Sequence, residues 1–318
     1  MEQKKSASLK TAYAEGTEIL KDAGITEHML DAWYLLEYVT GVTKARYYMD
    51  PDRSMDSEAY ETYLACIRKR ATHIPLQHIT GVQEFMGLEF AVNEHVLIPR
   101  QDTEVLVEET LEVLKRKSRE ISGNLEKFTS TTEEAKRKDA ADLEDSIRLL
   151  DLCTGSGCIL ISLLYYMKKA GQKISGTGAD ISGEALKVAE KNLRLLEEEG
   201  RPTLVQGDLF EHLSGTYDVI VSNPPYIRTA EIEKLEEEVK LHDPFGALDG
   251  KEDGLYFYRK IIEESQMHLK KQGQLLFEIG YDQGEAVSEL MKNAGFEQVY
   301  VKKDLAGLDR VVSGVYTK

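Results

Sequence analysis

Hydrophobic and polar positions follow three successive patterns along the chain. Over residues 8–70, apolar side chains recur at helical spacing, which predicts amphipathic helices. Residues 75–100 alternate between apolar and polar positions around Gly81 and Gly87, a pattern typical of a β-hairpin. From Ile147 onwards, short apolar runs alternate with helical periods, which predicts strand–helix repeats around a parallel sheet.

The N-terminal pattern predicts a small bundle of three helices in residues 1–73. Ser8 can cap the first helix, and Gly24 can end it. The bundle contains no catalytic constellation, so substrate recognition and plain packing both stay open as its role. We assign the recognition role to it, and we assign residues 74–98 to a β-hairpin that links it to the next domain.

Residues 99–318 are expected to form a doubly wound, Rossmann-like α/β domain, in which ligands bind at the carboxyl ends of the strands. Its first strands are predicted at residues 147–152, 174–179, 203–206 and 217–221. A charged segment near residues 115–145 has few apolar side chains, which predicts an exposed and partly disordered insertion.

Charged residues gather where the two predicted domains meet, at Arg100, Asp102 and Glu104. We favour an ion-pair network that locks this junction over direct contact with a substrate. Thr103 or Asp102 can cap the helix that follows.

A glycine-rich turn, Asp151-Leu152-Cys153-Thr154-Gly155-Ser156-Gly157, follows the first of these strands. It lacks the third glycine of a dinucleotide loop, and the sequence contains no GxxxxGK[ST] phosphate loop. An acid at Asp151 suits a ligand with an ammonium or sulfonium group better than a diphosphate. Asp180, after the second strand, is placed to accept hydrogen bonds from ribose hydroxyls, and Asp208 and Leu209, after the third, are placed to flank an adenine.

The fourth strand ends at Asn223-Pro224-Pro225-Tyr226. Two prolines cannot continue a sheet ladder, because each fixes φ and lacks an N–H, so the loop is stiff. We interpret it as a site for a planar NH2 group. The side-chain carbonyl of Asn223 and the backbone carbonyl of Pro224 would accept its two hydrogens, and the ring of Tyr226 would lie against its face. The loop alone does not choose between a glutamine amide and the amine of adenine.

Composition narrows the class of protein. The formal charge of −16 argues against broad nucleic-acid binding, which relies on Lys and Arg contacts to phosphate. No apolar run approaches the ~20 residues of a membrane span. The three cysteines lack CxxC spacing, so we expect reduced structural thiols and no metal. We therefore expect a cytoplasmic protein that binds neither membranes nor, directly, nucleic acid.

The acid-headed turn and the strand-end acids resemble class I S-adenosylmethionine-dependent methyltransferases, and the Asn-Pro-Pro-Tyr loop narrows this to the enzymes that methylate amino groups. Further motifs resemble the peptide chain release factor N(5)-glutamine methyltransferases, over the whole chain except the charged insertion. In chain order, these motifs are Pro75-Leu76-Gln77-His78-Ile79-Thr80-Gly81, Leu97-Ile98-Pro99-Arg100, Asp102-Thr103-Glu104, Asp151 to Gly157, Asn223 to Tyr226, Ala247-Leu248-Asp249-Gly250, Asp253-Gly254-Leu255, Glu278-Ile279-Gly280 and Asp304-Leu305-Ala306-Gly307-Leu308-Asp309-Arg310.

This resemblance implies methyl transfer from S-adenosylmethionine to the side-chain amide nitrogen of the glutamine in the Gly-Gly-Gln loop of class 1 translation release factors. We expect the enzyme to be a monomer when free. It implies cofactor contacts at Cys153 to Gly157, Asp180, Leu209 and Asn223. The substrate glutamine falls on Asn223 to Tyr226, with Asn223, Pro224 and Tyr226 as the catalytic residues. The alternative is an adenine N6 methyltransferase on DNA or RNA, against which the acidic charge and the N-terminal bundle weigh.

Some positions depart from the family pattern. Cys153 stands where glycine is usual, so its backbone must either manage without the conformational freedom of glycine or not need it. Leu209 replaces a common aromatic residue, so packing against adenine is expected to be aliphatic. Glu278 is a distant candidate for a general base, although we favour a structural role for it.

Overall fold

The computed structural model describes residues 7–129, 146–196 and 202–318, with the backbone alone for residues 121–129. It divides into two compact units. One comprises Met1–Val82 with Glu236–His242, and the other comprises Gln83–Leu235 with Asp243–Lys318. Part of the predicted charged insertion, residues 130–145, lies outside the described residues.

The first unit is helical, as predicted, and Ser8 caps its first helix by accepting a hydrogen bond from the backbone N–H of Thr11 at 3.2 Å. The sequence predicted three helices, and residues 7–82 contain two further short ones that the periodicity was too brief to reveal. The bounds are α1 (Leu9–Asp22), α2 (His28–Thr40), α3 (Lys44–Met49), α4 (Ser57–Arg70) and α5 (Leu76–Thr80).

A distant helix, α10 (Glu237–His242), belongs to this unit. Buried Arg70 pairs with Asp31 through Nε at 2.7 Å and with Glu238 through Nη2 at 2.7 Å. A buried guanidinium left without its partners would carry a large desolvation cost, so these two contacts hold α10 to α2 and α4.

The hairpin is shorter than predicted. Its two strands are β1 (Val82–Phe85) and β2 (Leu88–Ala91), joined at Met86 and Gly87, both with positive φ. The preceding residues form α5 rather than a strand. Pro75 with its fixed φ lies at the start of this helix, and Gly81 ends it in the left-handed conformation at φ 76°.

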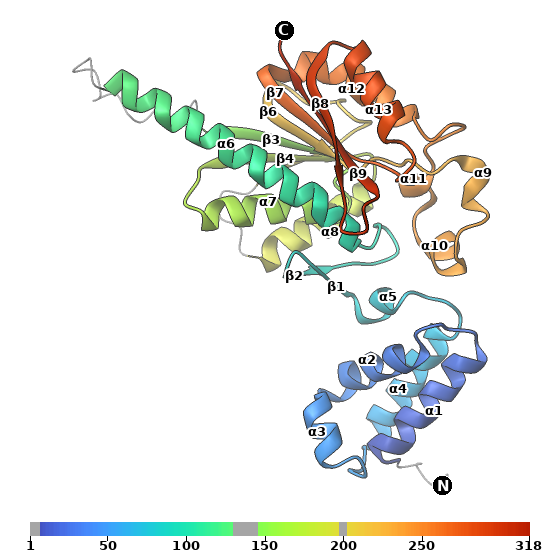
Figure 1. The fold of residues 1–318 in the computed structure, drawn as a ribbon. Helices are drawn as coiled ribbons and strands as arrows, with labels where there is room; N and C mark the ends of the chain where they lie inside the picture. The colour runs from blue at the N-terminus through green and yellow to red at the C-terminus, as the bar shows by residue number, and fades with distance from the viewer. Residues whose placement is uncertain (1–6, 130–145, 197–201) are drawn as a thin grey trace. The chain divides into compact units, whose positions relative to one another are not determined.

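The second unit contains a seven-stranded sheet in the order β5-β4-β3-β6-β7-β9-β8 (Figure 1). Strands β3 to β7 run parallel to one another, and β9 is antiparallel to β7 and β8. The predicted doubly wound α/β domain is confirmed. Each of the four predicted strands matches within one residue. The bounds are β3 (Ile147–Leu152), β4 (Ile174–Asp180), β5 (Thr203–Gln206), β6 (Tyr217–Ser222), β7 (Leu269–Glu278), β8 (Phe296–Lys303) and β9 (Asp309–Tyr316).

Helices cover both faces of this sheet (Figure 1). Alternation along β3 sends Ile147 and Leu149 into a core with α6, α7 and α8, and Leu150 and Leu152 into a second core with α12 and α13. No helix in the described part of the chain is both long and apolar enough to cross a membrane. The bounds are η1 (Gln101–Thr103), α6 (Glu104–Thr129), α7 (Cys158–Lys169), α8 (Gly183–Leu195), α9 (Thr229–Ile232), α11 (Phe245–Leu248), α12 (Tyr256–His268) and α13 (Gly284–Asn293).

Strand register brings the candidate loops to one edge of the sheet. Leu152 of β3 lies beside Ala179 of β4 and Ser222 of β6. Since these strands are parallel, the glycine-rich turn, Asp180 and the Asn-Pro-Pro-Tyr loop all emerge at the same carboxyl edge. The chain order reverses around β3, and such a switch point is where open α/β sheets bind ligands.

Candidate active site

A cavity of about 360 Å³ lies in the second unit at this carboxyl edge. Several of its lining residues are ones that the sequence singled out for a cofactor, namely Cys153, Thr154, Gly155, Ser156, Asp180, Asp208, Leu209 and Asn223. Asp151 and Gly157 are not among the lining residues. From the Asn-Pro-Pro-Tyr loop, Asn223 and Pro225 reach the cavity, whereas Pro224 and Tyr226 do not line it.

The glycine-rich turn is held by its own hydrogen bonds and by two acids. The hydroxyl of Thr154 donates to Asp151 Oδ2 at 2.6 Å, and the backbone N–H of Gly155 donates to Asp180 Oδ2 at 2.8 Å. A β-carbon on Gly157 would lie 3.2 Å from the β-carbon of Ala189 on α8, so glycine lets the turn pack closely there. Asp151 thus holds the turn through Thr154 without lining the cavity, and Asp180 holds it from the end of the adjacent strand β4.

Burial raises the pKa of Asp151 to about 7, although the hydrogen bonds from Thr154 and the backbone of Leu160 lower it. Its Oδ1 accepts no hydrogen bond of good geometry from any described residue. A cation bound nearby would offset the cost of ionising this buried acid. The cavity also offers apolar walls at Val96, Ile181 and Leu209, so the residues present fit a cofactor with a cationic group and an adenine ring.

Two residues of the cavity wall adopt the left-handed backbone conformation without being glycine. Cys153 has φ 60°, and Leu209 has φ 53°. The turn therefore does require the conformation that glycine adopts freely, and a cysteine adopts it here at a cost of roughly 1 kcal/mol or more. Strained backbone of this kind gathers at functional sites, in agreement with the position of both residues on the cavity.

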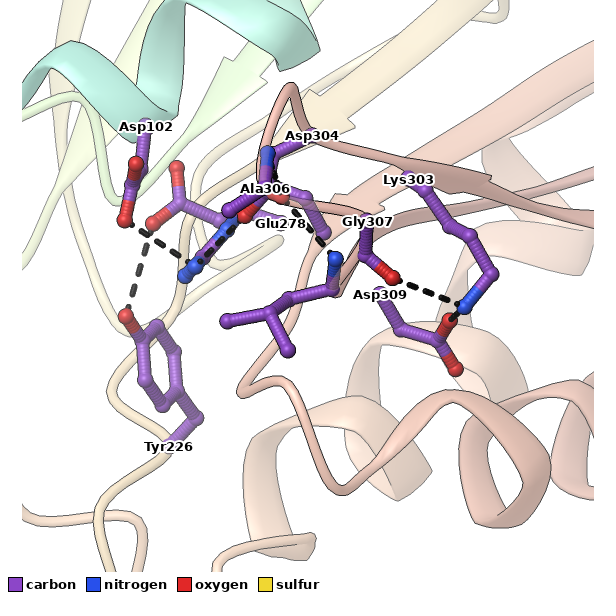
Figure 2. Close-up of polar contacts among 10 residues, drawn as sticks. Asp102, Tyr226, Glu278, Lys303, Asp304, Ala306, Gly307 and Asp309 are labelled. Carbon is purple, nitrogen blue, oxygen red and sulfur yellow. Dashed lines mark hydrogen bonds and ion pairs between the residues drawn. The ribbon is translucent and has the colours of Figure 1, made fainter.

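The Asn-Pro-Pro-Tyr loop is held at both ends by side chains distant in sequence. At its start, Asn223 Nδ2 lies 3.4 Å from Thr103 Oγ1. At its end, the Tyr226 hydroxyl donates to Glu278 Oε1 at 3.4 Å, as Figure 2 shows, and the Tyr226 carbonyl accepts from Gln283 Nε2 at 3.0 Å. Burial is the main cause that raises the pKa of Tyr226, so its hydroxyl stays protonated and can donate a hydrogen bond.

Glycines let a second loop approach the backbone of Tyr226. A β-carbon on Gly250 would lie 2.7 Å from Tyr226 Cα, and one on Gly254 would lie 2.5 Å from the Tyr226 carbonyl oxygen. A parallel bridge between Ile227 and Asp249 joins the two loops. In the sequence, Gly250 and Gly254 stood out only because they belong to motifs that resemble the family. No periodicity indicated which residues they contact.

A charged cluster lies near the hydroxyl end of Tyr226, and Figure 2 labels Asp102, Glu278 and Asp304 within it. Arg310 Nη2 lies 3.0 Å from Asp102 Oδ2 and 3.1 Å from Asp304 Oδ2. Burial raises the pKa of Glu278 to about 7, while the hydrogen bond from Thr103 and the charge of Arg310 lower it. Glu278 therefore titrates in the physiological range while it contacts the loop.

The three charged residues predicted to lock the domain junction pair with separate partners. Arg100 lies 2.8 Å from Asp243, Asp102 pairs with Arg310, and Glu104 accepts a hydrogen bond from the backbone N–H of Met86 at 2.7 Å. Each residue anchors a segment of the second unit, and they do so separately rather than as one network.

Comparison with known proteins agrees with this geometry. Residues 11–81 match the model of the PrmC N-terminal domain, and residues 139–239 match that of the methyltransferase small domain. The release factor glutamine methyltransferase of Caulobacter vibrioides is 38% identical over 97% of this chain and 96% of that protein. The protein of the same name from Agrobacterium fabrum is 37% identical over 92% of each.

Among solved structures, the catalytic domain of hMettl16 in complex with the MAT2A 3'UTR hairpin 6 has a TM-score of 0.52 and is 15% identical. The match covers 80% of this chain and 82% of that one, and it shows a shared fold. The relatives from Caulobacter and Agrobacterium extend the likeness to nearly the full length of the chain. By its sequence, this chain belongs to the release factor glutamine methyltransferase family.

Proposed function

We propose that this chain transfers a methyl group from S-adenosylmethionine to the side-chain amide nitrogen of the glutamine in the Gly-Gly-Gln loop of a class 1 release factor. Near full-length similarity to release factor glutamine methyltransferases supports this activity. The observation that carries it is the position of Asn223 and Pro225, at the end of β6, on the cavity that the glycine-rich turn also lines.

In this proposal the cavity takes the cofactor. When bound, S-adenosylmethionine supplies a methyl group on a positively charged sulfur. The carboxylate of Asp180, which already accepts hydrogen bonds from Gly155 and Ser182, keeps lone pairs for ribose hydroxyls. Leu209 and Asp208, which line the cavity, would hold the adenine, with Leu209 as an aliphatic surface, and Asp151 would provide negative charge on the other side of the turn.

The Asn-Pro-Pro-Tyr loop would hold the glutamine. The Asn223 side-chain carbonyl and the Pro224 backbone carbonyl accept the two hydrogens of the amide, and the Tyr226 ring lies against its plane. Because Gly250, Gly254 and Gln283 fix the backbone of Tyr226, the ring is pre-organised before the substrate arrives. The loop acts chiefly by positioning, since no Asp, Glu or His lies within it.

An amide nitrogen is a poor nucleophile because its lone pair is delocalised into the carbonyl. Two oxygen acceptors on its hydrogens favour the positive charge that develops as its electron pair forms the new N–C bond. The bound S-adenosylmethionine would supply the methyl group by loss of its C–S bond, and the electron pair of that bond would stay on sulfur. One N–H proton then leaves to water.

The main alternative was methylation of adenine N6 in DNA or RNA. The names of the relatives favour glutamine, and the resemblance to hMettl16 extends to the fold alone. We further propose that the helical bundle of the first unit recognises the release factor, and that the enzyme works as a cytoplasmic monomer without direct contact with nucleic acid. The net charge of −16 supports the last of these points.

A competition assay tests the choice of substrate. The protein is incubated with methyl-labelled S-adenosylmethionine and equal amounts of a class 1 release factor and adenine-containing nucleic acid. We expect the label in the release factor, and we expect none in a release factor whose loop glutamine is replaced by alanine. Label in the nucleic acid instead would overturn the proposed function.

A further inference from the structure

We propose that Thr103 is a positioning residue, which holds the side-chain amide of Asn223 with its oxygen towards the substrate, and that Glu278 sets the direction of this hydrogen bond. The inference rests on the proposed function, because it explains how the glutamine amide meets an acceptor rather than a donor. It gives Thr103, which the sequence indicated only as a possible helix cap, a role in the reaction.

The need for such a residue follows from the chemistry of asparagine. Its amide presents a carbonyl oxygen on one side and an NH2 group on the other, and rotation about the Cβ–Cγ axis exchanges them. If Asn223 turned its NH2 group to the glutamine, two donors would face each other. Methyl transfer would lose the acceptor that stabilises the developing positive charge.

Thr103 occupies the position that decides this orientation. Its side chain is buried, at 3% exposed, and its Oγ1 lies 3.4 Å from Asn223 Nδ2. Thr103 also lines the cavity beside Asn223. With Nδ2 directed at Thr103, the Asn223 oxygen is left for the other side. A hydroxyl can donate as well as accept, however, so Thr103 alone does not fix the direction.

Glu278 supplies the missing direction. Its Oε2 is buried and accepts no hydrogen bond of good geometry from any described residue, and Thr103 is among the groups that lower its pKa. We infer that the Thr103 hydroxyl turns its proton towards this carboxylate. An ionised carboxylate accepts hydrogen bonds and cannot donate them. Since the Thr103 proton goes to Glu278, the Thr103 oxygen is left with lone pairs for the Asn223 NH2 group. Glu278 thus fixes the direction of the Thr103 hydroxyl, and Thr103 in turn fixes which side of the Asn223 amide faces the substrate.

The same carboxylate holds the other end of the loop, where it accepts the hydrogen bond of the Tyr226 hydroxyl at 3.4 Å (Figure 2). Arg310 and Asp102 act on it electrostatically, and the hydroxyl of Tyr258 donates to its backbone carbonyl at 3.0 Å. Glu278 therefore accepts from the Tyr226 hydroxyl, and in this proposal it also receives the Thr103 proton, so that its negative charge arranges the amide site from both ends.

The test compares variants in single-turnover methylation of a release factor, with cofactor and release factor both saturating. Thr103→Val keeps the shape and removes the hydroxyl, whereas Thr103→Ser keeps the hydroxyl. Thr110→Val is the matched control, because this threonine is also buried but donates only to the Leu106 carbonyl of its own helix. Glu278→Gln keeps the size of the side chain and removes the charge. Cofactor affinity is measured on each variant by titration.

We expect Thr103→Val to lower the single-turnover rate constant by at least about tenfold while cofactor affinity stays within roughly threefold. Thr103→Ser should remain within about threefold of the wild type, and Thr110→Val should be unchanged in rate. Glu278→Gln should also lower the rate, because a neutral amide no longer fixes the direction of the Thr103 hydroxyl.

Each other outcome has a definite meaning. A wild-type rate for Thr103→Val, or an equal loss in Thr103→Ser, would overturn the positioning role while leaving the proposed function intact. A wild-type protein that methylates no release factor would instead overturn the proposed function and this inference with it. If Thr103→Val lowers Tm far more than Thr110→Val, Glu278→Gln decides the matter, and its unaltered rate would overturn the role of the carboxylate.

Discussion

The two loops that meet at the cavity are held in different ways. The glycine-rich turn depends on nearby strand ends, because Thr154 bonds Asp151 and Gly155 bonds Asp180 of the adjacent strand. The Asn-Pro-Pro-Tyr loop instead depends on Thr103, Glu278 and Gln283, which lie far away in sequence. Cofactor binding should therefore depend on residues at adjacent strand ends, whereas the geometry of the acceptor loop depends on residues from several distant segments of the domain.

The largest effect that separates the two loops is expected from Asn223→Ala. This change removes one acceptor for the glutamine amide and leaves the glycine-rich turn untouched. Turnover should fall by about a hundredfold or more while cofactor affinity changes by less than roughly tenfold. Steady-state kinetics and cofactor titration measure the two quantities. Near-normal turnover would show that the loop does not act as we propose.

Asp180→Ala should show the opposite division. The variant loses the carboxylate that accepts from Gly155 and Ser182 and that we place at the ribose. We expect cofactor affinity to weaken by about thirtyfold, equivalent to roughly 2 kcal/mol, with turnover at saturating cofactor within a few-fold of the wild type. Glu184→Gln on the exposed start of α8 serves as the control. Unchanged affinity for Asp180→Ala would remove Asp180 from the cofactor site.

Gly250→Ala tests whether the acceptor loop depends on distant support. The added β-carbon would lie 2.7 Å from Tyr226 Cα, so the backbone of the loop must move. Turnover should fall by about tenfold, because small displacements of aligned groups are costly, and cofactor affinity should be nearly unchanged. Gly171→Ala is the control, since Gly171 does not line the cavity and a β-carbon there meets nothing within 4 Å, so its only cost is the backbone strain of a positive φ. Equal turnover in both variants would contradict the prediction.

The smallest expected effect concerns pH. The pKa of Glu278 is raised to about 7 from an ordinary value of 4.5, in surroundings that include Asp102, Arg310, Thr103, Tyr226 and Tyr258. Methyl transfer should slow several-fold as the pH falls below about 7, because the protonated acid becomes a donor. Glu278→Gln should abolish this dependence.

Stability should change with pH in the opposite direction to activity. The folded state binds the Glu278 proton more tightly than the unfolded state does, so the free energy of unfolding decreases as the pH rises from about 4.5 to 7. Denaturant titrations of the wild type and Glu278→Gln at several pH values measure the contribution of Glu278 to the free energy of unfolding. A rate and a stability that rise together over that range, both through Glu278, would contradict the proposed role of its charge.

The difference between the two loops also explains how far the sequence could be interpreted. The first four strands of the sheet, β3 to β6, and the order of their terminal acids follow from apolar runs and turn residues, and these predicted strands matched the structure within one residue. The residues that surround the glycine-rich turn were found for the same reason, because they lie at the ends of those strands.

The supports of the acceptor loop could not be found in this way. Thr103 precedes a helix and has the sequence of a cap, yet its hydroxyl lies beside Asn223, 120 residues away. Gly250 and Gly254 matter through contacts with Tyr226 that no periodicity reveals. Likewise, α10 is a short charged helix, and nothing in its composition indicated that Glu238 pairs with Arg70. Contacts between distant segments leave no repeat in the sequence.

The most direct test of the central claim is mass spectrometry of a class 1 release factor after incubation with the protein and S-adenosylmethionine. The peptide that contains the Gly-Gly-Gln loop should gain one methyl group, and fragmentation should place it on the side-chain amide of the glutamine. The Asn223→Ala protein should leave most of that peptide unmodified. A Gly-Gly-Gln peptide left unmodified by the wild-type protein, with the cofactor bound, would contradict the account.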